Sequence, residues 1–253
     1  MAELKTGRAW GRAGWRLLRL AGHLLHGLWT IVWRFPRLSM EQRNALVQAW
    51  ARGLLQRLGV ELQVRGTPPD NGPVLLVANH LSWLDIPVLH AARHCRFISK
   101  SDVASWPLVA TLARAAGTLF IDRSSRRDTL RMVKIMADAL AQRDVLAVFP
   151  EGTTSEGREM LPFRPNLIEA AIQAGAPVQP LGLRFIDRAS GADSEAPIYA
   201  GDTTLLTSVW RTLSAPAFIA RVTYGAPQTA QGRDRRTWAR DLQAEVEQLR
   251  RMR

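Results

Sequence analysis

Cysteine is nearly absent from this 253-residue chain, because Cys95 is the only one. A single thiol cannot form an intramolecular disulfide, which excludes a disulfide-stapled scaffold and favours a reducing compartment. The chain also lacks the C-x-x-C pairs of structural zinc sites and the Gly-x-Ser-x-Gly elbow of many serine hydrolases. The sequence therefore argues against both of these classes.

Acidic residues are scarce relative to basic ones, with 22 Asp and Glu against 34 Lys and Arg, a formal net charge of +12. Residues 1–60 carry ten basic side chains and only two acidic ones, so most of the excess lies there. Such a block can face nucleic acid, an anionic membrane or an acidic substrate. Hydrophobic residues make up 47% of the chain, enough for a globular core.

Long uncharged runs are also missing: none exceeds the 14 residues of the run at 20–33, against the roughly 20 needed to span a bilayer. Around this run, polar side chains recur every three or four residues: Arg8, Arg12, Arg16, Arg19, His23, His26, Thr30 and Arg34. Trp and Leu side chains occupy the opposite helical face. This pattern predicts an amphipathic helix lying in a membrane interface. The alternative is a helix that packs on its own domain through the apolar face.

A second helix is predicted after Pro36. Ser39 and Gln42 have the spacing of a capping box, and Gly59 is a typical stop signal. No small-residue cleavage site follows the first helix, so we expect the segment to be retained. Residues 1–60 are thus predicted to form a membrane-associating helical hairpin, and residues 61–253 the main domain.

Short apolar runs alternate with helical patterns from residue 61 onward, and Trp238 begins the pattern of a closing amphipathic helix. The predicted strands are Glu61–Val64, Val74–Ala78, Arg96–Ser99, Thr118–Ile121, Val145–Phe149, Val178–Phe185 and Phe218–Val222. The predicted helices between them include Pro107–Ala116, Thr129–Gln142 and Asn166–Ala174. This alternation predicts an α/β fold with a mostly parallel sheet flanked by helices.

Polar residues gather where three of these strands end. His80 and Asp85 follow the second strand, and their side chains can meet only if His80 lies in the loop and Asp85 in the first turn of a helix, with Ser82 as a candidate N-cap. A histidine whose other ring nitrogen is held by a carboxylate is a general base for an alcohol. A His-x4-Asp pair by itself is more often structural, so its neighbours decide the interpretation.

Four blocks in order supply that context: NHLSWLD at 79–85, GTLFIDR at 117–123, FPEGTTS at 149–155 and APVQPLGL at 176–183. With them the chain resembles the glycerophospholipid acyltransferases, whose best-known members are the 1-acylglycerol-3-phosphate acyltransferases. The resemblance covers residues 74–185 and is specific only when all four blocks are taken together. It implies that His80 deprotonates the acceptor hydroxyl, that Asp85 orients His80, and that no acyl-enzyme forms.

The resemblance also implies an acceptor-binding set. Lys100 and Arg123 would hold the anionic head of the acceptor, and Glu151, Gly152 and Thr153 match the family's acceptor-binding loop. The acceptor is then a lysolipid, first of all 1-acylglycerol-3-phosphate giving phosphatidic acid. The acyl donor is a thioester of coenzyme A or acyl carrier protein, and we expect no metal or other cofactor.

One departure from the family bears on the acceptor. The third block usually has Arg where this chain has Thr154, which removes one candidate for binding phosphate. The Thr form resembles a branch that acylates lyso-ornithine lipids, so that acceptor is the alternative. Arg158 or Arg164 are candidates to compensate for the missing arginine.

Two other functions are suggested by parts of the sequence. His90, His94 and Cys95 have the residue types of metal ligands, which makes a metallohydrolase the more distant alternative, although no carboxylate falls at a matching spacing. Nucleic-acid binding would explain the charge, but Tyr199 and Tyr224 are the only tyrosines and form no stacking platform. We therefore expect a membrane partner and no nucleic acid, with the protein on the cytoplasmic face of the inner or plasma membrane.

Overall fold

A helical hairpin precedes the sheet, as predicted. In the computed structural model, which describes residues 2–100, 104–121 and 125–252, helix α1 spans Ala2–Trp33 and helix α2 spans Met40–Leu58, with a 3₁₀ turn, η1, at Phe35–Arg37 between them. The predicted capping box begins α2: Gln42 N–H donates to Ser39 Oγ, and Ser39 N–H donates to the Gln42 side chain. Helix α2 therefore starts and stops at its predicted signals, Ser39 and Gly59, and α1 ends before Pro36.

The described part of the main domain forms a seven-stranded sheet in the order β1-β7-β6-β2-β5-β3-β4. Its neighbouring strands are parallel except β6 and β7, which are antiparallel. The strands are β1 (Val60–Arg65), β2 (Val74–Ala78), β3 (Arg96–Lys100), β4 (Leu119–Ile121), β5 (Val145–Val148), β6 (Val178–Asp187) and β7 (Phe218–Tyr224). All seven coincide closely with predicted strands, and the predicted mostly parallel α/β fold is confirmed.

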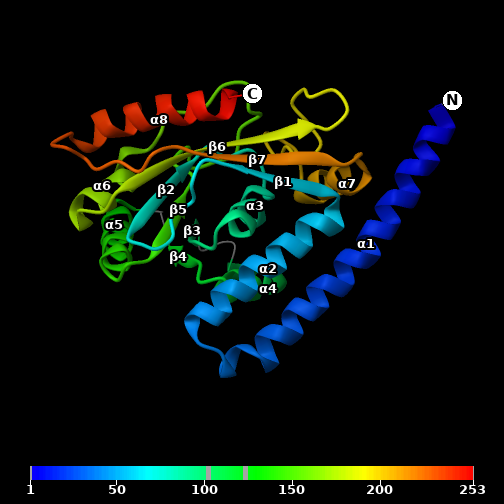
Figure 1. Ribbon diagram of the computed structural model, residues 1–253, viewed down its shortest axis with the longest axis horizontal. Helices are drawn as coiled ribbons and strands as arrows, with labels where there is room; N and C mark the ends of the chain where they lie inside the picture. Colours follow the sequence, from blue (N-terminus) through cyan, green and yellow to red (C-terminus); the bar gives the residue numbers. More distant parts are fainter. Residues whose placement is uncertain (1, 101–103, 122–124, 253) are drawn as a thin grey trace.

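Helices cover both faces of this sheet (Figure 1). On one face the core contains residues of α2, α3 and α7, and on the other it contains residues of α5, α6 and α8. The remaining helices are α3 (Asp85–Ala92), α4 (Pro107–Ala115), α5 (Arg126–Ala141), α6 (Pro165–Ala174), α7 (Leu205–Ser214) and α8 (Arg235–Arg251). The sequence analysis did not predict α7.

Strand β2 lies at the centre of the sheet, between β5 and β6. Its five apolar residues are all buried, and they alternate between the two cores: Leu76 faces the side of α2 and α3, whereas Leu75 and Val77 face the side of α5 and α6. A strand buried on both faces is expected to be a continuous apolar run. The chain leaving β2 is therefore held firmly by packing on both sides.

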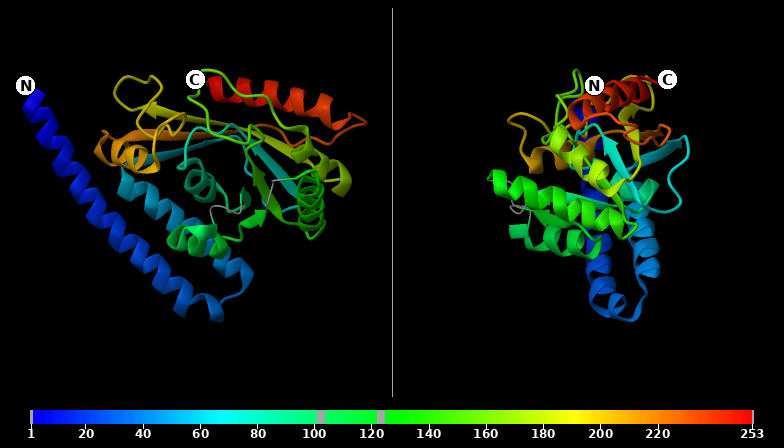
Figure 2. Two further views of the ribbon diagram at one scale, coloured as in Figure 1. Left: turned by 180° about the vertical axis from the view of Figure 1, so that it is seen from behind. Right: turned by 90° about the vertical axis from the view of Figure 1, so that its left-hand side faces the viewer.

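Helix α1 packs on the domain through part of its polar face and leaves most of its apolar side chains exposed. Ala13, Arg16, His23 and Thr30 are each less than 10% exposed, and α2 lies between α1 and the sheet (Figures 1 and 2). The exposed apolar side chains of α1, each at least half exposed, are Trp10, Trp15, Leu17, Leu18, Leu25, Trp29, Val32 and Trp33. The alternative in which α1 packs on its own domain through the apolar face is therefore wrong.

Arg16 fastens α1 to the main domain. Its Nη1 atom donates to the carbonyl oxygens of Leu213 and Ala215 at 3.0 and 2.7 Å, at the C-terminal end of α7. The guanidinium packs against Gly59, which has φ of 75° and where a β-carbon would lie 1.9 Å from Arg16 Nη2. Burial lowers the pKa of Arg16 from its ordinary value, with the charge of Arg12 adding to the effect. These contacts hold a buried cation between the hairpin and the end of α7.

Within the described residues, no helix combines the length and apolar character required to cross a membrane.

Candidate active site

The candidate site lies where the chain leaves β2. Asn79 is buried and bridges β2 to β6, because its Nδ2 donates to the Leu183 carbonyl at 3.1 Å and its Oδ1 accepts from Leu183 N–H at 2.7 Å. These two bonds fix the backbone immediately before His80. The sequence analysis assigned Asn79 no role, and only its place at the start of the NHLSWLD block could have indicated one.

The His80 and Asp85 side chains meet as predicted. His80 Nδ1 and Asp85 Oδ2 are 2.7 Å apart, with the Asp85 side chain fully buried and the His80 side chain 18% exposed. Asp85 is the first residue of α3, whose N-cap is Leu84, so the expectation that Ser82 caps this helix is wrong. Ser82 Oγ instead donates to the Pro197 carbonyl and accepts from Leu84 N–H. Its hydroxyl thus joins this turn to the segment before α7.

Asp85 Oδ2 holds the whole turn in place. Besides His80 Nδ1, it accepts from the backbone N–H groups of Leu81 and Ser82 at 2.6 and 2.9 Å. An ionised carboxylate is an acceptor only, so His80 Nδ1 carries the hydrogen in this bond and Nε2 is the basic nitrogen. The arrangement selects the tautomer that a general base requires.

Phe149 fixes the plane of the imidazole. The rings of His80 and Phe149 stack with centroids 4.0 Å apart and an interplanar angle of 6°. Phe149 directly follows β5, the parallel neighbour of β2, so the two rings come from adjacent strand ends. One ring face of His80 is thus covered by the stacked Phe149 ring.

Glu151 ties the 149–155 loop to the His80 turn. Its Oε1 accepts from His80 N–H at 2.7 Å and its Oε2 accepts from Leu161 N–H at 2.9 Å, and Ser155 N–H donates to the His80 carbonyl at 2.9 Å. Burial raises the pKa of Glu151 above its ordinary value, and the two backbone N–H bonds oppose that rise. The carboxylate is therefore part of the framework that positions His80.

Gly152 allows a guanidinium to approach the loop backbone. It has φ of 76°, a conformation that favours glycine, and a β-carbon there would lie 2.5 Å from Arg164 Cζ. Arg164 therefore packs against Gly152, while Thr153 is exposed beside it. Arg158 lies farther along the loop and pairs with Glu156 at 3.7 Å, with both side chains largely exposed. Of the two compensating arginines suggested by the sequence, Arg164 is the one in contact with Gly152.

Two predicted acceptor-binding cations cannot be placed in the site. Lys100 ends β3, which pairs with β4 through Ile121, but its side chain is outside the described part of the structure. Arg123 lies outside the described residues altogether.

The histidine cluster suggested for a metal is buried beside Phe97. The His90 and His94 ring centroids are 5.4 Å apart, and burial lowers the pKa of His90 to about 3 and that of His94 to about 4. Across the described residues no group of three or more His, Cys, Asp or Glu side chains is placed to hold a metal ion.

The part of the chain that forms this site is similar to known proteins. Residues 60–184, which contain the whole His80 turn and the 149–155 loop, match the Acyltransferase family. A 1-acyl-sn-glycerol-3-phosphate acyltransferase of Neisseria meningitidis is 38% identical over 73% of this chain and 72% of its own length. A lyso-ornithine lipid O-acyltransferase of Pseudomonas aeruginosa is 37% identical over 91% of this chain and 90% of its own.

The fold has a solved counterpart as well. The crystal structure of the 1-acyl-sn-glycerophosphate acyltransferase PlsC from Thermotoga maritima superposes with a TM-score of 0.64 at 20% identity, covering 94% of this chain and 99% of the other. At that identity the likeness concerns the fold. The sequence relatives show that the chain belongs to the acyltransferase family.

Proposed function

We propose that this protein transfers a fatty acyl group from a thioester to the free hydroxyl of a lysolipid, with 1-acylglycerol-3-phosphate as the first candidate acceptor. The observation that carries the proposal is the 2.7 Å contact between His80 Nδ1 and the buried Asp85 carboxylate. It leaves His80 Nε2 as a base on a partly exposed side chain. The names of the two sequence relatives support the substrate class.

The proposed chemistry uses the acceptor as the nucleophile. His80 Nε2 takes the hydroxyl proton as the acceptor oxygen attacks the thioester carbonyl carbon. The Asp85 carboxylate stabilises the imidazolium that forms. When the C–S bond breaks, the imidazolium returns the proton to the thiolate, giving the acylated lipid and free thiol. The donor, coenzyme A or acyl carrier protein, is a co-substrate, and the proposal includes no resident cofactor or metal.

The acceptor head is proposed to lie over the 149–155 loop. The family resemblance assigns Glu151, Gly152 and Thr153 to the acceptor-binding loop, and it implies that Lys100 and Arg123 hold the anionic head from outside this loop. The contact of Arg164 with Gly152 adds a cation beside this loop, in which Thr154 supplies none. A guanidinium offers parallel N–H donors that match the oxygens of phosphate or carboxylate.

A lyso-ornithine lipid is the second candidate acceptor. Thr154 and the relative from Pseudomonas aeruginosa, which covers more of this chain than the relative from Neisseria meningitidis, both favour it. Its amino-acid head carries a carboxylate that Arg164 can also pair with. The catalytic step is unchanged, since only the lipid that bears the hydroxyl differs.

The hairpin is proposed to hold the enzyme on the cytoplasmic face of the inner or plasma membrane. Helix α1 turns eight largely exposed Trp, Leu and Val side chains outward, and its flanking residues are basic. Trp and Leu on one face with Arg nearby is typical of helices that lie in an anionic membrane interface. This placement brings the site close to its lipid acceptor.

The acceptor panel is the experiment that tests this function. Purified protein and its His80→Ala variant are incubated with acyl-CoA or acyl carrier protein thioester and either lysophosphatidic acid or lyso-ornithine lipid, and products are read by mass spectrometry. We expect acylation of one acceptor by the wild type, with at least a hundredfold less product from a variant whose thermal unfolding is unchanged. Product from neither acceptor, or an equally active variant, would contradict the proposal.

A further inference from the structure

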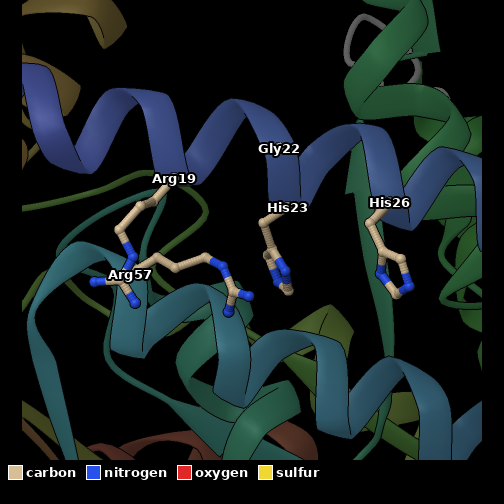
Figure 3. Close-up of a pocket in the computed structure, with 5 residues that line it drawn as sticks. All are labelled: Arg19, Gly22, His23, His26 and Arg57. Atoms are coloured by element: carbon tan, nitrogen blue, oxygen red, sulfur yellow. The ribbon is translucent and has the colours of Figure 1, made fainter.

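A second cationic site lies in the hairpin, between α1 and α2. It is a pocket of about 400 Å³ lined by Arg19, Gly22, His23 and His26 of α1 and by Arg57 of α2. Figure 3 shows the α1 side chains pointing toward α2, with the Arg57 side chain extending toward His23. Four groups that are cations or can become cations thus share one crevice, and none of them belongs to the His80 site.

This cluster has no carboxylate to balance it. In the part of the chain that the structure describes, neither Arg19 nor Arg57 makes an ion pair, and the only polar partner of Arg57 is the Gly53 carbonyl at 2.8 Å. On α2 the only acidic residue is Glu41, sixteen residues before Arg57, which is roughly 24 Å along the helix axis. Like charges so close together repel each other unless an anion joins them.

The pocket is also shaped in advance. His23 is 7% exposed, its Nε2 donates to the Trp50 carbonyl at 2.9 Å, and its ring stacks on Trp50 with centroids 4.9 Å apart. A β-carbon at Gly53 would lie 2.9 Å from His23 Cε1 and 3.0 Å from Arg57 Nη1, so glycine at this position lets both side chains pack on α2. His23 Nδ1 has no partner among the described residues. Because Nε2 carries the hydrogen bonded to Trp50, Nδ1 can donate to an anion when the ring is protonated.

Charge within the cluster favours an anionic ligand. Burial lowers the pKa of His23, and the neighbouring charges of Arg57 and His26 lower it further, while the bond to Trp50 opposes this. Guanidinium groups match the tetrahedral set of phosphate oxygens, which several donors can share. We propose that this pocket binds a phosphate group.

The surroundings of the pocket favour a phosphate carried by a membrane lipid. At 100° per residue, Gly22 lies within roughly 60° of Leu18, Leu25 and Trp29 on the α1 surface. These three side chains are 67%, 67% and 52% exposed. The pocket therefore borders the exposed apolar face of α1, so a lipid can place its chains on that face and its phosphate among the cations. This site does not depend on acyl transfer.

Vesicle binding by two matched double variants tests the site. Arg19→Gln with Arg57→Gln removes two charges from the pocket, and Arg8→Gln with Arg34→Gln removes two exposed charges of the hairpin outside it. Binding to phosphatidylcholine vesicles containing phosphatidylglycerol is measured by co-sedimentation at one fixed ionic strength, so that both variants lose two charges under equal screening. We expect roughly tenfold weaker binding for the pocket variant alone, since it loses charge-assisted hydrogen bonds to the phosphate. Equal binding by the two variants would overturn the proposal.

The NMR signals of the His23 imidazole distinguish a lipid phosphate from inorganic phosphate. The imidazole resonances of detergent-solubilised protein are followed by NMR while short-chain phosphatidylglycerol or inorganic phosphate is added. A shift of the His23 signals with the lipid, absent in the pocket variant, supports a lipid head group. A shift with inorganic phosphate alone would overturn the lipid as the source, and no shift with either would overturn the site.

Discussion

The region at the end of β2 and the α1–α2 hairpin differ in how their polar side chains are paired. At the end of β2, Asn79, His80, Asp85 and Glu151 each make hydrogen bonds of 2.6–3.1 Å to one another or to the backbone. In the hairpin, the cations of the α1–α2 pocket have no acidic partner among the described residues, and apolar side chains of α1 face outward.

The strand-end region is therefore preorganised, whereas the hairpin leaves cations and apolar side chains available to a partner outside the chain. A hydrogen-bonded site has its geometry before substrate arrives, so less reorganisation is needed during the reaction. An exposed apolar stripe beside cations that have no acidic partner marks a surface that contacts another protein or a membrane. We infer that the strand-end region supplies the chemistry and that the hairpin supplies the location.

The largest effect is expected from removing the charge of Asp85. In Asp85→Asn, the amide oxygen can keep the three bonds now made by Oδ2, so the turn keeps its shape but loses its negative charge. The imidazolium is then less stable, and kcat should fall roughly 10²- to 10⁴-fold. Steady-state kinetics with the acceptor identified by the panel measure this change.

A matched control for this variant is Asp193→Asn, since Asp193 is 71% exposed and pairs with Arg184. Its kcat should stay within twofold of the wild type. If Asp85→Asn retained full activity, Asp85 would serve only to shape the turn.

The second effect concerns the link between the two regions. Arg16→Met keeps the volume in contact with Gly59 but removes the donors to the last carbonyls of α7. We expect the free energy of unfolding to fall by about 2 kcal/mol, a roughly thirtyfold change in the folding equilibrium. Urea unfolding measures it, with the exposed Arg8→Met as control. An equal loss in both variants would show that Arg16 is not a link.

The third effect tests the membrane-facing surface. Leu25 on α1 and Leu130 on α5 are 67% and 66% exposed, so Leu25→Glu and Leu130→Glu place the same charge at equally open positions. We expect Leu25→Glu to lower partition onto anionic vesicles roughly tenfold, because a charge replaces an apolar side chain in the interface. Leu130→Glu should change partition less than twofold. Similar losses would mean that α1 has no special role.

The smallest effect is expected at the acceptor loop. Arg164→Gln removes the guanidinium that packs on Gly152, and Arg158→Gln removes the more distant one. We expect KM for the acceptor to rise roughly fivefold in Arg164→Gln, with kcat nearly unchanged, because one charge-assisted contact to the head group is lost. The same rise in Arg158→Gln instead would assign the compensation to Arg158.

Much of this architecture is readable from local patterns. The strands, the hairpin and the Ser39 capping box depend on residues close together in the chain, and so does the contact of His80 with Asp85. Helix α7 was missed although Thr204 caps it, since Thr204 Oγ1 accepts from Thr207 N–H at 3.2 Å. Its short, threonine-containing sequence has weak helix propensity, and packing makes up the difference.

Other features depend on contacts between distant residues. Asn79 bonds to Leu183, which is 104 positions away in the chain. Gly152 is needed because the Arg164 side chain packs against its backbone. Neither contact can be predicted from neighbouring residues. The sequence left two orientations of α1 open, because its amphipathic pattern does not say which face the domain covers. Arg16 decides this, through carbonyl groups nearly two hundred residues away.

The central claim is that the acceptor hydroxyl, activated by His80, attacks the thioester directly. The most direct test follows thiol release from acyl-CoA in a stopped-flow instrument, with and without the lysolipid acceptor. The account predicts release only when acceptor is present, and at least a hundredfold less in His80→Ala. A burst of thiol equal to the enzyme concentration without acceptor would show that a protein side chain takes the acyl group, and would contradict the account.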